Sequence, residues 1–246
     1  AASREQLVVD AASNLRAILG QIDSAIQLLP ASPASKFLYD GMKRLHEMSA
    51  KFTIAASLRG AHSGKPFEPA SLQALVNQAG QALSPAARAS DVKVHIAGHD
   101  TLHVQEPALL TLVLQTLLEN AAAYSPKGGE IIVAAHTNQY GQTITVSDHG
   151  SGIPADKLAN LFEPFVKAEG AETFNHEGLG FSLYMDKLVL AYLGGSIDLE
   201  SEEGKGTVVT IALPVTHTAG RLPLQPKQLP VHARVEAAQA LSLIHI

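Results

Sequence analysis

The chain of 246 residues contains no cysteine. It therefore has no disulfide framework, no thiolate metal site and no thiol nucleophile. No apolar run approaches the roughly 20 residues that cross a bilayer, and no signal peptide is visible. Basic residues are few as well: 18 Lys and Arg stand against 23 Asp and Glu, a net charge of -5, which disfavours nucleic acid as a partner. We expect a cytoplasmic protein that would reach a membrane only through an upstream segment missing from this sequence.

Two amphipathic helices are predicted in the first sixty residues. Hydrophobic residues make up 46% of the chain, and they recur at helical spacing in two stripes on either side of Pro30 and Pro33. A lone hairpin of two such helices leaves apolar surface in water, so we expect two copies to form a dimeric four-helix bundle. The alternative is a hairpin that packs against its own domain. The stripes consist of Leu15, Ile18, Ile22, Ile26 and Leu29, and of Leu38, Met42, Leu45, Met48, Phe52 and Ala55.

The pattern changes after a polar linker at residues 61–66. Helices segregate from a mostly antiparallel sheet, which predicts the α+β class and a two-layer α/β sandwich. We assign residues 1–60 to the hairpin, 67–215 to the sandwich and 216–246 to a Pro-containing tail, whose final "LSLIHI" continues no pattern and is interpreted as artefactual. Predicted helices cover residues 71–83, 107–124, 155–162 and 181–193, and predicted strands cover 91–97, 130–137, 142–147, 195–201 and 206–214.

One predicted strand ends at a carboxylate, Asp148, and two glycines follow it, Gly150 and Gly152. A buried carboxylate needs a hydrogen-bond donor. A second pair, Gly178 and Gly180, precedes a predicted helix, whose free N–H groups attract phosphate. This second pair is no dinucleotide fingerprint, because the third glycine is missing and no strand leads in. Each pair alone is also explained by turns that require a positive φ.

Several short motifs follow one another at characteristic spacings. They are Asn120 in "LLENAAAYSP", the set Asp148-x-Gly150-x-Gly152, "LFEPF" at 161–165, Gly178-x-Gly180 and Gly204-x-Gly206-Thr207. In this order they resemble the conserved boxes of the Bergerat-type (GHKL) ATPase domain of sensor histidine kinases. With the helical hairpin ahead of them, the chain is similar to the transmitter region of a two-component system over residues 3–214. The resemblance implies a dimerising, phospho-acceptor-like hairpin followed by an ATP-binding domain of the GHKL type.

The resemblance also implies a role for each matching residue. Asp148 would accept a hydrogen bond from the adenine amino group, and Ile153 would form apolar wall. Asn120 would supply an oxygen to Mg²⁺, a hard cation that prefers oxygen ligands. Residues 166–177 would form a lid over ATP. The implied nucleotide-binding residues are Asn120, Tyr124, Asp148, Gly150, Gly152, Ile153, Lys167, Gly178, Leu179, Gly180 and Thr207, with Lys167 near the terminal phosphate and Thr207 near adenine.

The first helix departs from the family at the phospho-acceptor. Where the family has a histidine followed by an acidic base, this chain has Ser13 and Asn14, and a register shifted by four residues would place Val9 there instead. No histidine precedes His46, which lies on the second predicted helix and is interpreted as a solvated side chain. Asn14 cannot take a proton. Serine lacks the nucleophilicity of imidazole, so Ser13 as an alternative acceptor is a weak third option.

Further departures lie at the phosphate end of the implied site. Ala17 stands where the family has a threonine used to dephosphorylate the response regulator. Thr116 replaces the first asparagine of the motif around Asn120, and Ala123 replaces a common lysine. The residues that the resemblance implies near adenine are therefore present, while several of those that it implies near the phosphates are replaced.

These residues together predict an ATP-binding, histidine-kinase-like transmitter of a phosphorelay that is deficient in its own histidine autophosphorylation. The implied cofactors are ATP and Mg²⁺. The implied partners are a second copy of the chain and a response-regulator receiver or a partner kinase. The alternative function is a non-enzymatic scaffold, a pseudokinase, which dimerises, senses nucleotide and passes on a conformational signal.

Overall fold

The chain separates into two compact units, Ala1–Ala61 and His62–Ile246. The computed structural model describes residues 18–22, 24–26, 28–30, 32, 35, 38, 42, 58, 63–138, 141–163 and 182–215. Among these residues, no helix combines the length and the apolar character that a membrane crossing needs.

In the first unit, the structure describes part of the first predicted helix. Residues 18–22 and 24–26 are helical, as the apolar stripe predicts. One part of the stripe is buried within the unit, and another part lies on its surface. The phospho-acceptor position and the adjacent base position that the resemblance implies, Ser13 and Asn14, lie outside the described residues. His46 also lies outside them. The buried apolar residues are Leu19, Ile26 and Met42, and the exposed ones are Ile18, Ile22, Leu28, Leu29 and Leu38.

The second unit is built on a five-stranded sheet with the order β2-β4-β5-β7-β6. Only β2 and β4 pair in parallel, and the other neighbours are antiparallel. A separate antiparallel pair is formed by β1 (Glu68–Ser71) and β3 (Thr101–Val104). The five strands are β2 (Lys93–Gly98), β4 (Glu130–Asn138), β5 (Gly141–Asp148), β6 (Ser196–Glu202) and β7 (Gly206–Leu213).

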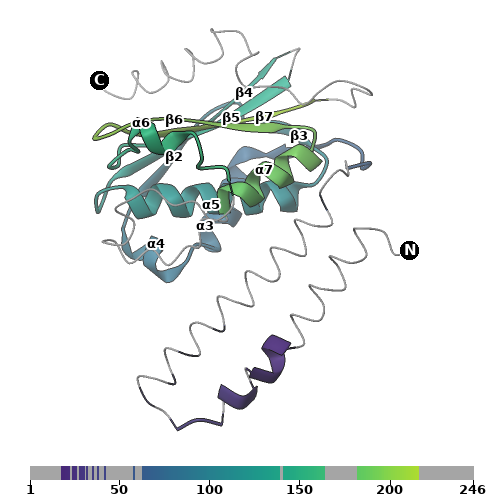
Figure 1. Cartoon of the computed structure of the whole chain (residues 1–246). Coiled ribbons are helices and arrows are strands. Elements are labelled where there is room, and N and C mark those ends of the chain that lie inside the picture. Colours follow the sequence, from purple (N-terminus) through teal and green to yellow (C-terminus); the bar gives the residue numbers. More distant parts are fainter. Residues whose placement is uncertain are drawn as a thin grey trace. The chain divides into compact units, whose positions relative to one another are not determined.

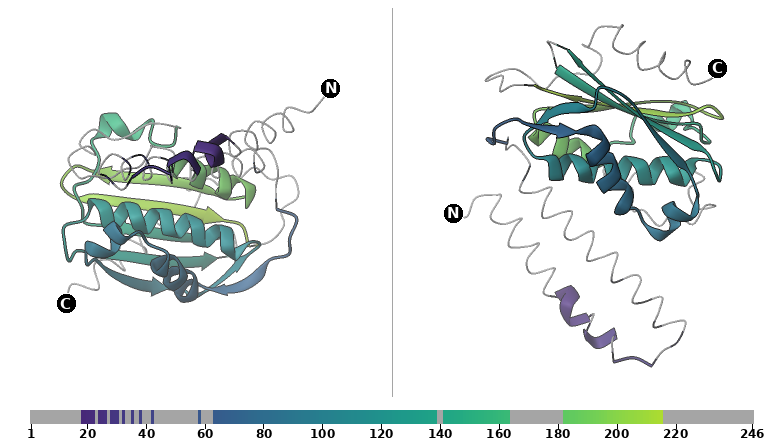
Figure 2. Two further views of the ribbon diagram at one scale, coloured as in Figure 1. Left: turned by 90° about the horizontal axis from the view of Figure 1, so that it is seen from below. Right: turned by 180° about the vertical axis from the view of Figure 1, so that it is seen from behind.

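Helices α3, α5 and α7 lie on one face of this sheet, so the unit is the two-layer α/β sandwich that the sequence predicts (Figures 1 and 2). The long helix α5 begins and ends at the predicted residues. Its start is marked by Pro107, because proline is tolerated in a first helical turn. The helices are α3 (Leu72–Gln81), α4 (Pro85–Ala89), α5 (Pro107–Tyr124), α6 (Ala155–Leu158) and α7 (Ser182–Tyr192).

Three short elements are not predicted, and one is shorter than predicted. Strand β1 contains a proline, which a strand tolerates at a sheet edge. Strand β3 and helix α4 have four and five residues, too few to show a clear hydrophobic period. Helix α6 ends at Leu158 instead of near Phe162. These elements depend on contacts with distant residues, which local periodicity does not report.

Within the second unit, a polar cluster ties residues 63–65 to the end of α7 and to the residue before α5. The backbone N–H of Ser63 donates to the carbonyl of Tyr192 at 2.9 Å, at the end of α7. The Glu106 carboxylate, just before α5, accepts from the Lys65 ammonium at 2.9 Å and from the Tyr192 hydroxyl at 3.0 Å. The hydrogen bond from Lys65 is the main reason why the pKa of Glu106 lies below its usual value.

The helix-covered face of the sheet ends in a row of four side chains. On β5, Ile144 and Val146 are buried, and Asp148 follows on the same face because side chains alternate along a strand. Residues paired directly across neighbouring strands also share a face. Asp148 pairs with Ile131 on β4 and with Thr207 on β7, and Thr207 pairs with Ser201 on β6. We refer to Ile131, Asp148, Thr207 and Ser201 as the terminal row.

Candidate nucleotide-binding site

Asp148 is a buried carboxylate at the end of β5, with 8% of its surface exposed. Burial raises the pKa of this carboxyl, while backbone N–H groups of Gly150 and Thr207 act in the opposite direction. The hydrogen bond from the Gly150 N–H to Oδ1 measures 2.8 Å. The carboxylate is therefore oriented by the chain itself, and its lone pairs are the strongest acceptors in the terminal row.

The two glycines after Asp148 are required by backbone packing. A Cβ on Gly150 would lie 2.3 Å from the carbonyl oxygen of Tyr124, so only glycine lets this loop pass the end of α5. The next residue, Ser151, donates its N–H to the same carbonyl at 3.1 Å. Gly152 has φ +65°, and a Cβ there would lie 2.0 Å from the carbonyl oxygen of Glu202. Both glycines thus fix the loop between α5 and the β6–β7 turn.

Ser201 joins this loop to Thr207. Its Oγ accepts the backbone N–H of Ile153 at 2.9 Å and lies 3.0 Å from the Thr207 hydroxyl. It also donates to the carbonyl of Gly206 at 2.8 Å. Ser201 was not predicted as a site residue from the sequence. Its position directly opposite Thr207 in the β6–β7 hairpin would have pointed to it, but that position is known only once the strand register is known.

Helix α5 contributes the other side of the candidate site. Tyr124 is its last residue and is 36% exposed, and burial raises the pKa of its phenol. Asn120 lies one turn earlier and is partly exposed. The neighbouring residue Glu119 makes a structural contact away from the terminal row: its carboxylate accepts a hydrogen bond from the backbone N–H of Ser84 at 3.1 Å. Glu119 therefore anchors the segment before α4 to α5.

The structure brings together one part of the predicted site. Asp148, Gly150, Ile153 and Thr207 meet at the ends of β5 and β7, and the Tyr124 backbone contacts the loop that holds them. Gly152 lies in the same loop as Gly150, and Asn120 lies one turn before Tyr124 on α5. Four other predicted residues lie outside the described residues, together with the predicted lid: Lys167, Gly178, Leu179 and Gly180.

The metal expectation rests on one described residue. No group of three or more His, Asp or Glu side chains in the described ranges is arranged to hold a metal ion. The Asn120 side chain offers an amide oxygen, which is a ligand type that Mg²⁺ accepts. One protein oxygen suits an ion that is held mainly by nucleotide phosphates and water. The described residues therefore fit a magnesium ion that arrives with a nucleotide.

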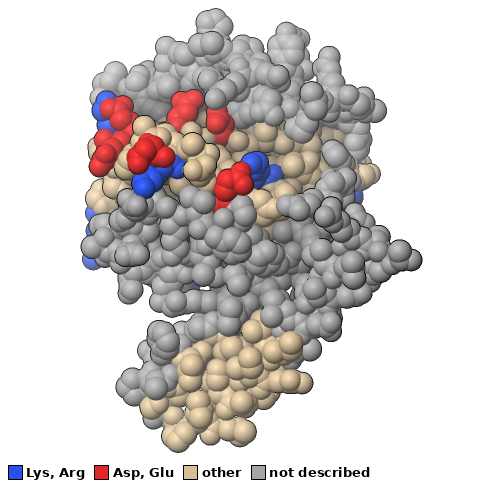
Figure 3. Space-filling model, viewed as in Figure 1, with Lys and Arg blue, Asp and Glu red and all other residues tan. Residues whose placement is uncertain are grey.

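Charges of both signs are intermixed on the face seen in Figure 3. Among the described residues, Lys205 lies 2.6 Å from Glu202, and Lys187 lies 3.9 Å from Glu163. Each of these two lysines therefore has an acidic partner close by.

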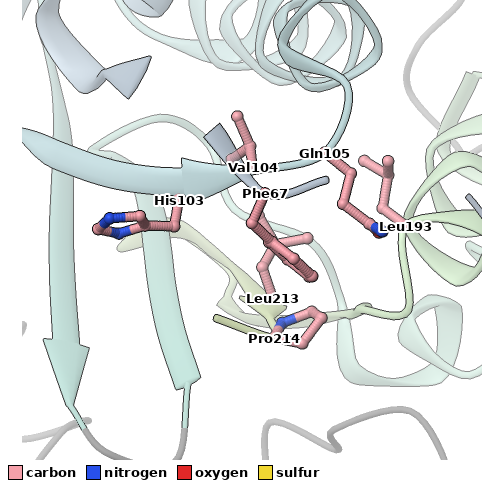
Figure 4. A pocket seen from close by; sticks show the side chains of 7 residues that line it. All are labelled: Phe67, His103, Val104, Gln105, Leu193, Leu213 and Pro214. Atoms are coloured by element: carbon pink, nitrogen blue, oxygen red, sulfur yellow. The ribbon is translucent and has the colours of Figure 1, made fainter. Parts of the chain in front are cut away.

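A small apolar pocket lies at the other end of the sheet (Figure 4). Leu213, which lines it, is the last residue of β7, whereas Thr207 is near the first. In Figure 4 the ring of Phe67 lies close to Leu213 and Pro214. This pocket is separate from the terminal row, so it is not the candidate nucleotide site. Its lining residues are Phe67, His103, Val104, Gln105, Leu193, Leu213 and Pro214.

We expect Asp148→Asn to stabilise the nucleotide-free protein near neutral pH. Because burial raises the folded pKa of Asp148 above its ordinary 3.8, the folded state binds a proton more readily than the unfolded state. The stability that comes from this tighter proton binding is fully present below the pKa that Asp148 has in the unfolded chain. It is lost as pH rises through the higher pKa that Asp148 has in the folded protein. The neutral amide avoids this loss, so the variant's advantage should grow from pH 4 to pH 7. Urea unfolding at several pH values measures the difference in free energy of unfolding between the variant and wild type. An Asn variant that is less stable than wild type at every pH would contradict the prediction.

Comparison with known proteins identifies the domain around this row. Residues 105–217 match the family described as histidine kinase-, DNA gyrase B-, and HSP90-like ATPase. The sensor protein SrrB of Staphylococcus aureus (strain NCTC 8325 / PS 47) is 37% identical over 102 residues, which are 42% of this chain and 18% of SrrB. The matched part is thus less than a fifth of this curated relative.

Two solved structures share the fold. Full-length ShkA in complex with AMPPNP has a TM-score of 0.65 at 20% identity, over 87% of this chain and 46% of ShkA. The mycobacterial sensor histidine kinase MprB has a TM-score of 0.52 at 25% identity, over 60% of this chain and 97% of MprB. Residues 105–217 are therefore a domain of the histidine kinase-, DNA gyrase B-, and HSP90-like ATPase family, with the fold that the solved structures share.

Proposed function

We propose that the second unit binds ATP with Mg²⁺ at the terminal row, with the adenine amino group on Asp148. The observation that carries this proposal is the buried Asp148 carboxylate, which the chain orients with N–H donors from Gly150 and Thr207. A buried acceptor of this kind matches an amino group that carries only donors. The fold likeness to ShkA, which was solved with the ATP analogue AMPPNP, supports the same ligand class.

The remaining residues have supporting roles in this proposal. Ile153 and Tyr124 would pack against the base, and Thr207 would complete the polar end of its pocket. Asn120 would hold Mg²⁺, which neutralises phosphate charge when it is bound. Lys167 and the segment with Gly178, Leu179 and Gly180 would contact the phosphates.

We further propose that the chain does not phosphorylate itself on histidine. Phosphoryl transfer needs an in-line nucleophile, a base and charge stabilisation. At the expected acceptor position the chain has Ser13 and Asn14, which supply neither a histidine nor a base. Phosphoryl transfer would then use a histidine of a partner kinase, with a response-regulator receiver as the later acceptor. The second candidate is a nucleotide-sensing scaffold in the cytoplasm, which the same substitution favours.

Incubation with γ-labelled ATP and Mg²⁺ tests this proposal. We expect no acid-labile label on the wild-type chain. Ser13→His should restore at most weak labelling, because Asn14 remains a poor base, and the double change with Asn14→Glu should label more strongly. Acid-labile label on the wild type that His46→Ala removes would place the acceptor on the second helix and overturn the assignment of Ser13.

Dimerisation through the hairpin is a separate proposal. In the first unit Ile22 is 44% exposed and Leu28 86% exposed, which leaves apolar surface for a second copy. Ile22→Lys should weaken the dimer at least about tenfold, because it would bury an unpaired charge. Light scattering at micromolar concentration measures this. Gln21→Lys adds the same charge beside the stripe and should leave the dimer intact, and a monomeric wild type would refute the proposal.

A further inference from the structure

Ser201 occupies the outer end of the terminal row, next to Thr207. Ser201, Thr207 and Asp148 are paired in register across β6, β7 and β5, so their side chains share one face of the sheet. Asp148 and Thr207 are the polar members that the proposed nucleotide would meet. Ser201 contacts the second of these two.

The hydrogen bonds of Ser201 fix the direction of each proton. A hydroxyl has one proton and two lone pairs. A carbonyl oxygen only accepts, so the proton of Ser201 goes to Gly206, 2.8 Å away. A backbone N–H only donates, so that of Ile153, 2.9 Å away, occupies one lone pair of Ser201. The second lone pair then faces Thr207 at 3.0 Å, and Thr207 must be the donor.

Thr207 is therefore left with lone pairs alone for a ligand. Its only proton is committed to Ser201, which is the sole partner of this hydroxyl among the described residues. The ionised Asp148 carboxylate also presents lone pairs alone. The polar end of the base pocket thus consists of two acceptors side by side, which suits a ligand group with two N–H donors and opposes a carbonyl oxygen.

We propose that Ser201 is a positioning residue that holds Thr207 as a hydrogen-bond acceptor, so that the site selects a purine with an amino group over one with a carbonyl at the same position. This inference rests on the proposed ATP site and adds the group that sets its hydrogen-bond polarity. Without Ser201, the Thr207 hydroxyl is free to rotate and to donate to a carbonyl.

The test compares the affinities of the whole chain for ATP and for inosine triphosphate, which carries a carbonyl in place of the amino group. Calorimetry on wild type should show tighter binding of ATP. In Ser201→Ala the ratio of the two affinities should fall about tenfold, the worth of one hydrogen bond. A merely structural role would weaken both nucleotides alike and leave the ratio unchanged.

Three further variants sharpen the test. Ser201→Thr keeps the hydroxyl and should retain the wild-type ratio. Thr207→Val keeps the shape without the hydroxyl and should lower the ratio, which also serves if Ser201→Ala does not fold. Ser151→Ala removes a hydroxyl from the neighbouring loop, where its Oγ lies 3.4 Å from the Gly152 carbonyl, and should change nothing.

The outcomes separate the two proposals. If wild type binds neither nucleotide, the proposed ATP site fails, and the role of Ser201 fails with it. If wild type prefers ATP and folded Ser201→Ala and Thr207→Val keep that preference in full, the ATP site stands and the role of Ser201 is refuted.

Discussion

Asp148→Ala is expected to weaken binding of Mg·ATP by about one to two orders of magnitude. The change removes a hydrogen bond to a charged acceptor, which is worth about 1.5–3 kcal/mol. It also leaves the N–H of Gly150 without the carboxylate oxygen that accepts it at 2.8 Å. Calorimetry measures the affinity directly, and the thermal shift that nucleotide gives by linkage should shrink in parallel.

A matched control for this prediction is Asp156→Ala. Asp156 is also an aspartate of this region, but its side chain is 73% exposed on α6. It should therefore bind ATP as wild type does. Equal affinities for wild type and a folded Asp148→Ala would show that the adenine site lies elsewhere. Together with the expected gain in nucleotide-free stability of Asp148→Asn, loss of binding would mark Asp148 as a residue kept for ligand at a cost to the fold.

The second large effect concerns stability. Gly206→Ala is expected to lower the free energy of unfolding by about 3 kcal/mol or more, since backbone strain and overpacking each cost roughly 1–3 kcal/mol. Gly206 has φ +104°, and a Cβ there would lie 2.1 Å from the carbonyl oxygen of Asp148. Strands β5 and β7 would have to separate at the terminal row, so we expect nucleotide binding to fall as well.

Gly204→Ala supplies the control within the same turn. Gly204 also has a positive φ, +77°, but no atom lies within 4 Å of the Cβ position. Only the conformational cost remains, about 1–2 kcal/mol. Urea unfolding of both variants measures the difference. Equal losses would show that φ alone, and not the contact with β5, requires glycine at position 206.

Some features were predictable because they depend on neighbours along the chain. Helix α5 is long and apolar, and Pro107 marks its start. Strands β4 and β5 follow from continuous β-branched and apolar runs. The order of Asn120, Asp148 and the glycines was sufficient to predict the ATPase fold. Lys167 and Gly178 stay predictions, as they lie outside the described residues.

Other features required the tertiary structure. The sequence shows glycine at 150 and 152, but the reason, carbonyls of Tyr124 and Glu202 at the Cβ positions, depends on segments far away in the chain. Likewise, Glu119 beside Asn120 has the chemistry of a base, and only its contact with Ser84 shows that it is an anchor.

Sequence alone thus determined the sandwich, the position of Asp148 at a strand end and the absence of any histidine before His46, because periodicity, motif spacing and residue identity are local properties. Tertiary structure alone decided that Ser201 meets Thr207 and that Gly206 passes against Asp148. Strand register brings these residues together, and register depends on how whole strands pack against α5 and the other helices. Ser201 and Thr207 are only six residues apart, but which residues of their hairpin face each other is known only once the register is fixed.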